Sequence, residues 1–151
     1  MPQLKILLIE DEFLIAIDLE QILQDAGHDV CGIASTAADA MRIASATRPQ
    51  LAFVDIDLLD GRTGFDIARS FSKVGWPLAI FVTSHDSEVT TALDVGAGML
   101  RKPYHPSDIV MAAAYFAEGL LTPPPTTIPP RALRLAPAIS ARFASSKADD
   151  A

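Results

Sequence analysis

The stretch LKILLIEDE at residues 4–12 decides the fold, because a short apolar run ends directly on two carboxylates, Glu10 and Asp11. Three further apolar runs end on a polar residue in the same way: LAFV on Asp55, LAIFV on Thr83, and GMLR on Lys102, which precedes Pro103. A short apolar run with a polar end is typical of a buried parallel strand that reaches the carboxyl edge of its sheet. In open α/β sheets, ligands bind outside that edge. We therefore expect three carboxylates, one hydroxyl and one ammonium group to meet in one place.

The chemistry of this predicted cluster favours a cation and a phosphoryl group. Clustered carboxylates repel one another unless a cation joins them, and hard oxygen ligands of this kind suit Mg²⁺. Glu10 and Asp11 can serve one cation, one directly and one through water. Asp55 is then a candidate nucleophile that forms an aspartyl phosphate, with Thr83 and Lys102 as candidate partners of the phosphoryl oxygens. Taken alone, each residue also has an ordinary structural interpretation, such as a helix-capping acid or a surface lysine.

The order of strand-like and helix-like segments predicts an α/β fold over residues 3–121. Strands are expected at residues 4–9, 28–34, 51–54, 78–82 and 99–100. Helices are expected at residues 13–26, 36–47, 65–74, 87–95 and 108–120. Because each strand is followed by a helix, we expect one doubly wound, five-stranded parallel sheet with helices on both of its faces.

The segment from residue 122 to residue 151 differs from the rest of the chain in composition. It contains 6 of the 11 prolines and begins TPPPTTIPP. Proline removes hydrogen-bond donors and fixes the backbone, so we expect an extended or disordered tail. Residues 132–144 could form a short helix on contact with a partner.

Composition and charge narrow the functional classes. The chain has 151 residues, a net charge of -7 and a single cysteine, Cys31, which fits a reducing compartment. No apolar run approaches the length of a membrane span, and the start of the chain is a poor secretory signal, so a cytoplasmic protein without membrane contact is expected. Residues 1–121 carry 8 Lys and Arg residues against 17 Asp and Glu residues, which argues against direct DNA binding. His28 and His105 lack metal-ligand spacing and are expected to face solvent.

The order and spacing of the five polar residues resemble those of the receiver domain of bacterial two-component response regulators, over about residues 3–121. The resemblance implies a flavodoxin-like fold with strand order 2-1-3-4-5. It also implies that Asp55 is the phosphoacceptor and that Thr83 and Lys102 contact its phosphoryl group. Mg²⁺ would be bound by Asp11, Asp55 and the backbone carbonyl of Asp57, with Glu10 acting through water.

The same resemblance implies the partners of the chain. The phosphoryl donor would be a phosphohistidine on a sensor histidine kinase or on a phosphotransfer protein of a phosphorelay. The chain would take part in its own phosphorylation and dephosphorylation without being an enzyme in the usual sense. Its output would be a protein–protein contact through the face from Ser87 to Leu120, where homodimerisation could also occur.

Two alternatives and one departure accompany this interpretation. The segment DIDLLDG, which begins at Asp55, also resembles the Asp-x-Asp motif of haloacid-dehalogenase-type phosphatases, although those proteins carry it on the first strand. A degenerate receiver that acts as a phosphorylation-independent binding module is the other alternative. It is kept open by Met99, which stands where many receivers have an aromatic switch residue. Phosphate uptake separates the three, since a phosphatase turns over phosphomonoesters, a receiver labels itself and a degenerate receiver does neither.

Overall fold

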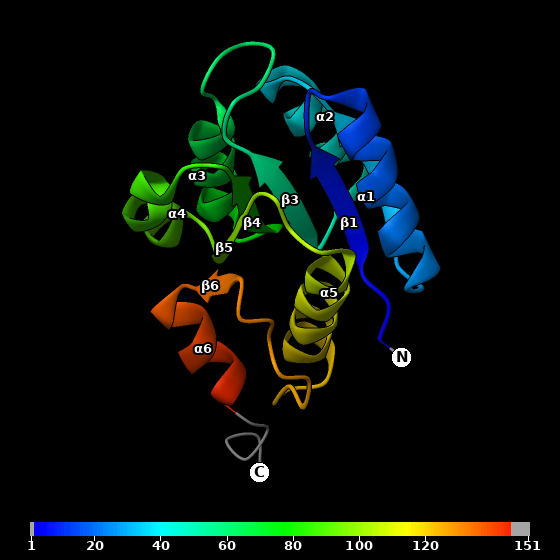
Figure 1. Ribbon diagram of the computed structural model, residues 1–151, viewed down its shortest axis with the longest axis vertical. Helices are drawn as coiled ribbons and strands as arrows, with labels where there is room; N and C mark the ends of the chain where they lie inside the picture. The colour runs from blue at the N-terminus through cyan, green and yellow to red at the C-terminus, as the bar shows by residue number, and fades with distance from the viewer. Residues whose placement is uncertain (1, 146–151) are drawn as a thin grey trace.

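The computed structural model describes residues 2–145 (Figure 1). The described part of the chain folds around one six-stranded sheet in the order β2-β1-β3-β4-β5-β6. The strands are β1 (Lys5–Ile9), β2 (Asp29–Ala34), β3 (Leu51–Asp55), β4 (Leu78–Thr83), β5 (Gly98–Arg101) and β6 (Leu133–Leu135). The first five strands are parallel, which confirms the predicted α/β fold and the strand order 2-1-3-4-5. The sixth strand was not predicted and pairs antiparallel with β5.

Helices cover both faces of the sheet. They are α1 (Phe13–Asp25), α2 (Ala37–Thr47), α3 (Gly64–Val74), α4 (Val89–Val95), α5 (Pro106–Leu121) and α6 (Pro137–Ala144), with one turn of 3-10 helix, η1 (Asp86–Glu88), before α4. One apolar cluster joins α1, α5 and α6 to the sheet, and a second joins α2, α3 and α4 to it. The described residues include no helix long and apolar enough to cross a membrane.

The interiors of the central strands β1, β3 and β4 are apolar because both of their faces are covered. In β1, for example, Ile6 and Leu8 belong to the cluster of α1 and α5, whereas Leu7 and Ile9 belong to the cluster on the other face. Successive side chains of a strand point to opposite faces, so a strand covered on both sides reads as a continuous apolar run. Polar side chains are therefore confined to the ends of these strands, and the predicted site residues lie at the carboxyl ends.

The prediction of a disordered tail is wrong for residues 133–144. In these residues, β6 adds to the outer edge of β5 and α6 packs beside α5, as Figure 1 shows. The connecting proline-rich segment is held by Glu118 of α5, which accepts hydrogen bonds from the amide groups of Thr126 and Thr127 at 2.9 and 3.1 Å and from both hydroxyls. These four bonds lower the pKa of Glu118 to about 2. The predicted tail also includes residues 146–151, which lie outside the described residues.

His28 also departs from its predicted exposure. It is only 7% exposed, and its Nδ1 accepts a hydrogen bond of 3.1 Å from the backbone N–H of Leu4. Burial lowers the pKa of His28, so the neutral imidazole is the form that fits this position. His105 is exposed, as predicted.

Candidate functional site

Four adjacent strands of the sheet, β1, β3, β4 and β5, bring the predicted site residues to one edge. β1 pairs with β3, β3 with β4, and β4 with β5. Glu10 and Asp11 follow β1, Asp55 ends β3, Thr83 ends β4, and Lys102 follows β5. Parallel pairing aligns these ends, so residues up to 92 positions apart in sequence come within hydrogen-bond distance.

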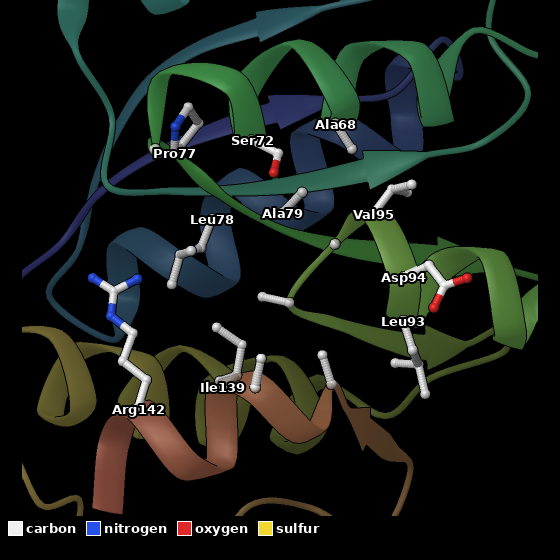
Figure 2. A pocket seen from close by; sticks show the side chains of 15 residues that line it. Ala68, Ser72, Pro77, Leu78, Ala79, Leu93, Asp94, Val95, Ile139 and Arg142 are labelled. Atoms are coloured by element: carbon white, nitrogen blue, oxygen red, sulfur yellow. The ribbon is translucent and has the colours of Figure 1, made fainter. Parts of the chain in front are cut away.

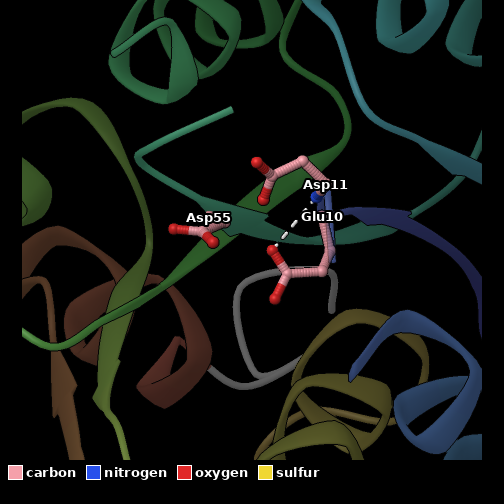
Figure 3. Close-up of side chains that lie close together, drawn as sticks. All are labelled: Glu10, Asp11 and Asp55. Atoms are coloured by element: carbon pink, nitrogen blue, oxygen red, sulfur yellow. Dashed lines mark hydrogen bonds between the residues drawn. The ribbon is translucent and has the colours of Figure 1, made fainter. Parts of the chain in front are cut away.

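The three carboxylates form the acidic part of the site. Glu10, Asp11 and Asp55 each offer an oxygen atom, and these atoms lie within 4.8 Å of one another (Figure 3). The backbone N–H of Asp11 donates a hydrogen bond of 3.1 Å to Oε2 of Glu10, which fixes the orientation of that carboxylate. Such a set of hard oxygen donors fits Mg²⁺ in charge and ligand type.

Lys102 supplies the positive charge of the site. Its Nζ donates hydrogen bonds to Oε1 of Glu10 at 3.2 Å and to Oδ2 of Asp55 at 3.3 Å. Burial alone would lower the pKa of Lys102, but attraction to Asp55 and Glu10 outweighs burial and raises it. The lysine is therefore a permanent cation directly beside the Asp55 carboxylate. Its peptide bond to Pro103 is cis.

Glu10 is the most strongly perturbed acid of the cluster. Its side chain is 4% exposed, and burial raises its pKa to about 8, with further upward contributions from the nearby Asp55. Lys102 acts in the opposite direction but does not compensate. Burial and a neighbouring acid both favour the protonated form of this carboxylate.

The site opens to solvent through a small hollow. This hollow, of about 180 Å³, is lined by Asp11, Glu12, Asp55, Asp57, Thr83, Ser84, His85 and Lys102. Thr83 is only 3% exposed, and its Oγ1 accepts a hydrogen bond of 3.1 Å from the backbone N–H of His85. The hydroxyl can therefore still donate its proton to an anion bound over Asp55.

The loop after β3 carries two features that the sequence analysis missed. Arg62 lies between the loops of β3 and β4, where it forms an ion pair with Asp57 at 3.2 Å and a second one with Glu88. A Cβ atom on Gly64 would lie 2.4 Å from the carbonyl oxygen of Asp55 and 2.6 Å from Cα of Ile56. Gly64 thus lets α3 start directly against the end of β3, and the Asp-Gly-x-x-Gly spacing in the loop was the available signal.

Met99 is buried within β5, at 2% exposure. Its register partners are Phe81 in β4 and Arg134 in β6. Met99 therefore lies between β4, which carries Thr83, and β6, which was not predicted. Its side chain is apolar and flexible.

Comparison with known proteins places the chain among response regulators. The family model described as "Response regulator receiver domain" matches residues 6–114. The phyllosphere-induced regulator PhyR of Methylorubrum extorquens is 38% identical over 116 residues, which cover 74% of this chain and 43% of PhyR. The chain therefore spans less than half the length of that curated relative.

Solved structures agree with this placement. The receiver domain of PhyR from Erythrobacter litoralis has a TM-score of 0.69 and 29% identity, and the match covers 77% of this chain and 91% of that domain. PhyR of Bartonella quintana, described as an anti-anti-sigma factor and solved in complex with the anti-sigma factor NepR, matches 52% of this chain and 33% of that chain, with 35% identity and a TM-score of 0.50. With a family model that covers most of the sheet and all five site positions, the chain belongs to the response regulator receiver domain family.

Proposed function

We propose that this chain is a phosphoacceptor of a two-component system or phosphorelay, and that phosphorylation of Asp55 switches its protein contacts. The observation that carries the proposal is the position of Lys102, whose Nζ lies 3.3 Å from the Asp55 carboxylate and 3.2 Å from Glu10. A structural ion pair needs one acid, whereas this lysine faces two acids of a three-carboxylate cluster. That arrangement suits a site built to hold a further anion together with a metal ion.

Each residue then has a definite task. One carboxylate oxygen of Asp55 attacks the phosphorus atom of the donor, while the donor nitrogen leaves with the bonding electron pair. Lys102 and the Thr83 hydroxyl stabilise the phosphoryl oxygens through charge and a hydrogen bond. Oδ1 of Asp55 accepts a 3.2 Å hydrogen bond from the backbone N–H of Asp57, which orients the carboxylate.

Mg²⁺ is part of the same proposal. Asp11, Asp55 and the backbone carbonyl of Asp57 would hold the ion, with Glu10 acting through water. The ion would neutralise charge on the incoming phosphoryl group. The close approach of oxygen atoms from Glu10, Asp11 and Asp55, all within 4.8 Å of one another, supports this assignment.

The phosphoryl donor is proposed to be a phosphohistidine on a sensor histidine kinase or phosphotransfer protein. A shallow hollow of about 710 Å³ lies beside the site, lined by Leu14, Ile15, Asp18, Ser84, Lys102, Pro103 and Tyr104. Phe13 and Leu14 at the start of α1 are exposed, although both are large and apolar. Exposed apolar side chains beside a reaction site are typical of a surface on which a partner docks.

The output is proposed to be a protein contact in the cytoplasm, without direct DNA binding. The PhyR relative solved with an anti-sigma factor supports a protein partner for a receiver of this kind. The predicted output face from Ser87 to Leu120 includes β5 and α5, which residues 133–144 partly cover. We expect homodimerisation through this face only when those residues have left it.

The proposal is tested by intact mass after incubation with acetyl phosphate and Mg²⁺. Wild-type protein is expected to gain one phosphoryl group, and Asp55→Asn is expected to gain none. Asp66→Asn is the matched control, because Asp66 is an exposed acid on α3 that pairs only with Arg69 among the described ion pairs. A gain by Asp55→Asn would place the acceptor elsewhere, and no gain by wild type, even with a purified phosphohistidine donor, would favour the degenerate binding module.

A further inference from the structure

Residues 133–144, here called the C-terminal cover, occupy the outer edge of the sheet. β6 pairs with β5 from Gly98 to Leu100, and the backbone N–H of Ala136 donates a 2.9 Å hydrogen bond to the carbonyl of Ala97. A Cβ atom on Gly98 would lie 2.9 Å from the carbonyl oxygen of Arg134, closer than real Cβ contacts. An edge strand is a ready template for a further strand, and here the chain itself fills that position.

The helix of the cover packs against α5 at Gly119, a residue without a side chain. Phe143 is 1% exposed, and its ring lies 5.6 Å from that of Tyr115 and 5.5 Å from that of Phe116. A Cβ atom on Gly119 of α5 would lie 2.3–2.5 Å from three carbons of the Phe143 ring. The cover is therefore packed into a site on α5 that only glycine at position 119 permits.

The rest of the seam between the cover and the receiver is loosely packed. A hollow of about 290 Å³ lies between α6 and the segments around α3, β4 and α4. In Figure 2, Ile139 of the cover faces Leu78 across this hollow, and Arg142 lies at the end nearest Pro77. The cover itself is one strand of 3 residues and one helix of 8 residues, too short to persist when undocked. It should therefore bind or leave the receiver as a unit.

The strand β5 connects the cover with the phosphorylation site. Leu100 pairs with Leu133 of the cover, and Lys102 follows two residues later with its Nζ at Asp55. A second hollow separates the two sides, lined by Met99, Arg101, Lys102, Pro103, Ala132 and Arg134. Because Lys102 contacts Asp55 and directly follows the strand that pairs with β6, a change at Asp55 bears on the same strand that holds the cover.

From this geometry we infer that β5 and α5 form a binding surface for a strand followed by a helix. The C-terminal cover fills this surface in the unphosphorylated chain. Phosphorylation of Asp55 releases the cover. The inference rests on the proposed function for its trigger. It follows by linkage that releasing the cover favours the phosphorylated state to the same extent.

The test is hydrogen–deuterium exchange on the full chain with Mg²⁺, before and after acetyl phosphate, with intact mass taken on the same samples. Peptides within residues 133–144 are expected to exchange faster by a factor of about 5 to 150 when Asp55 is phosphorylated, the usual range of coupling between two sites. Peptides of α1 should not change, and Asp55→Asn should show no effect of acetyl phosphate.

Gly119→Ala is the second variant, because its methyl group would displace Phe143 without touching the site. Its cover peptides should exchange fast with and without acetyl phosphate. Slow exchange in Gly119→Ala would overturn the seating of the cover. Unchanged exchange in wild-type protein that carries the phosphoryl group would overturn the inference while leaving the proposed function intact. Protein that takes up no phosphoryl group from acetyl phosphate or from a phosphohistidine donor would overturn both.

Discussion

Gly119→Ala is expected to destabilise the chain, although the same change stabilises most helices. Alanine is preferred to glycine inside a helix by about 1 kcal/mol. Here the new Cβ would lie 2.3–2.5 Å from carbons of the Phe143 ring, so the ring must move or α6 must leave. Overpacking of this kind costs about 1–3 kcal/mol. The net loss in the free energy of unfolding is therefore roughly 0–2 kcal/mol.

The sign of the effect should reverse when the ring is removed. In a Phe143→Ala background the clash disappears, and Gly119→Ala should then stabilise the chain by up to about 1 kcal/mol. The difference between the two backgrounds, about 1–3 kcal/mol, is the energy of the clash alone. Phe143→Ala by itself should cost up to about 3–5 kcal/mol, and less if α6 simply detaches.

Urea unfolding of the wild type, the two single variants and the double variant measures this cycle. The described packing requires a coupling well above about 0.5 kcal/mol, the limit within which independent sites add. If Gly119→Ala stabilised both backgrounds equally, α6 would not pack against Gly119 in solution, and the described docking of the cover on α5 would be wrong.

Three further predictions concern the phosphorylation site. The pKa of Glu10 is about 8 in the folded chain against 4.5 as its ordinary value, so the folded state keeps a proton that the unfolded state has lost, and stability without metal should fall as pH rises between these values. Glu10→Gln should remove this contribution from the pH dependence of urea unfolding, and equal pH dependence in the two proteins would contradict the raised pKa. Gly64→Ala should slow labelling of Asp55 by up to about 100-fold, because its Cβ meets backbone atoms at 2.4 Å that cannot give way, and labelling at the wild-type rate would refute this. Asp57→Asn should alter the lifetime of the aspartyl phosphate, followed by mass after removal of the donor, because the wild-type carboxylate adds negative charge near the phosphoryl group; an unchanged lifetime would count against that role.

The site could be predicted from the sequence because each of its residues ends an apolar run. A strand buried on both faces leaves only its ends for polar groups, so Asp55 and Thr83, which close their apolar runs, were expected at the carboxyl edge. Lys102 was expected at this edge as a partner of the phosphoryl group, whereas its contacts with both Glu10 and Asp55 come from the structure. The apolar pattern could not predict the ion pairs of Arg62 with Asp57 and Glu88, because the partners of a long exposed side chain depend on the folded structure.

The strand of the C-terminal cover escaped prediction for a different reason, and its helix was expected only on contact with a partner. A strand of 3 residues is too short for an alternating pattern, and the surrounding prolines suggested disorder. Gly119 within an apolar helix was the overlooked signal, because glycine there is costly unless another segment approaches closely. The burial of His28 was missed for a similar reason. The backbone N–H that donates a hydrogen bond to its Nδ1 belongs to Leu4, 24 residues away in the sequence.

The hydrogen bonds that Glu118 makes with Thr126 and Thr127 fix part of the linker between α5 and the cover, so the mobile part of the tether is short. After detachment, α6 would stay tethered through residues 122–132, at an effective concentration in the millimolar range that is typical of short linkers. Rebinding would be intramolecular and independent of protein concentration. A competing protein would then need either a high abundance or an affinity far above that of the cover, so the tether sets a threshold below which random encounters produce no signal.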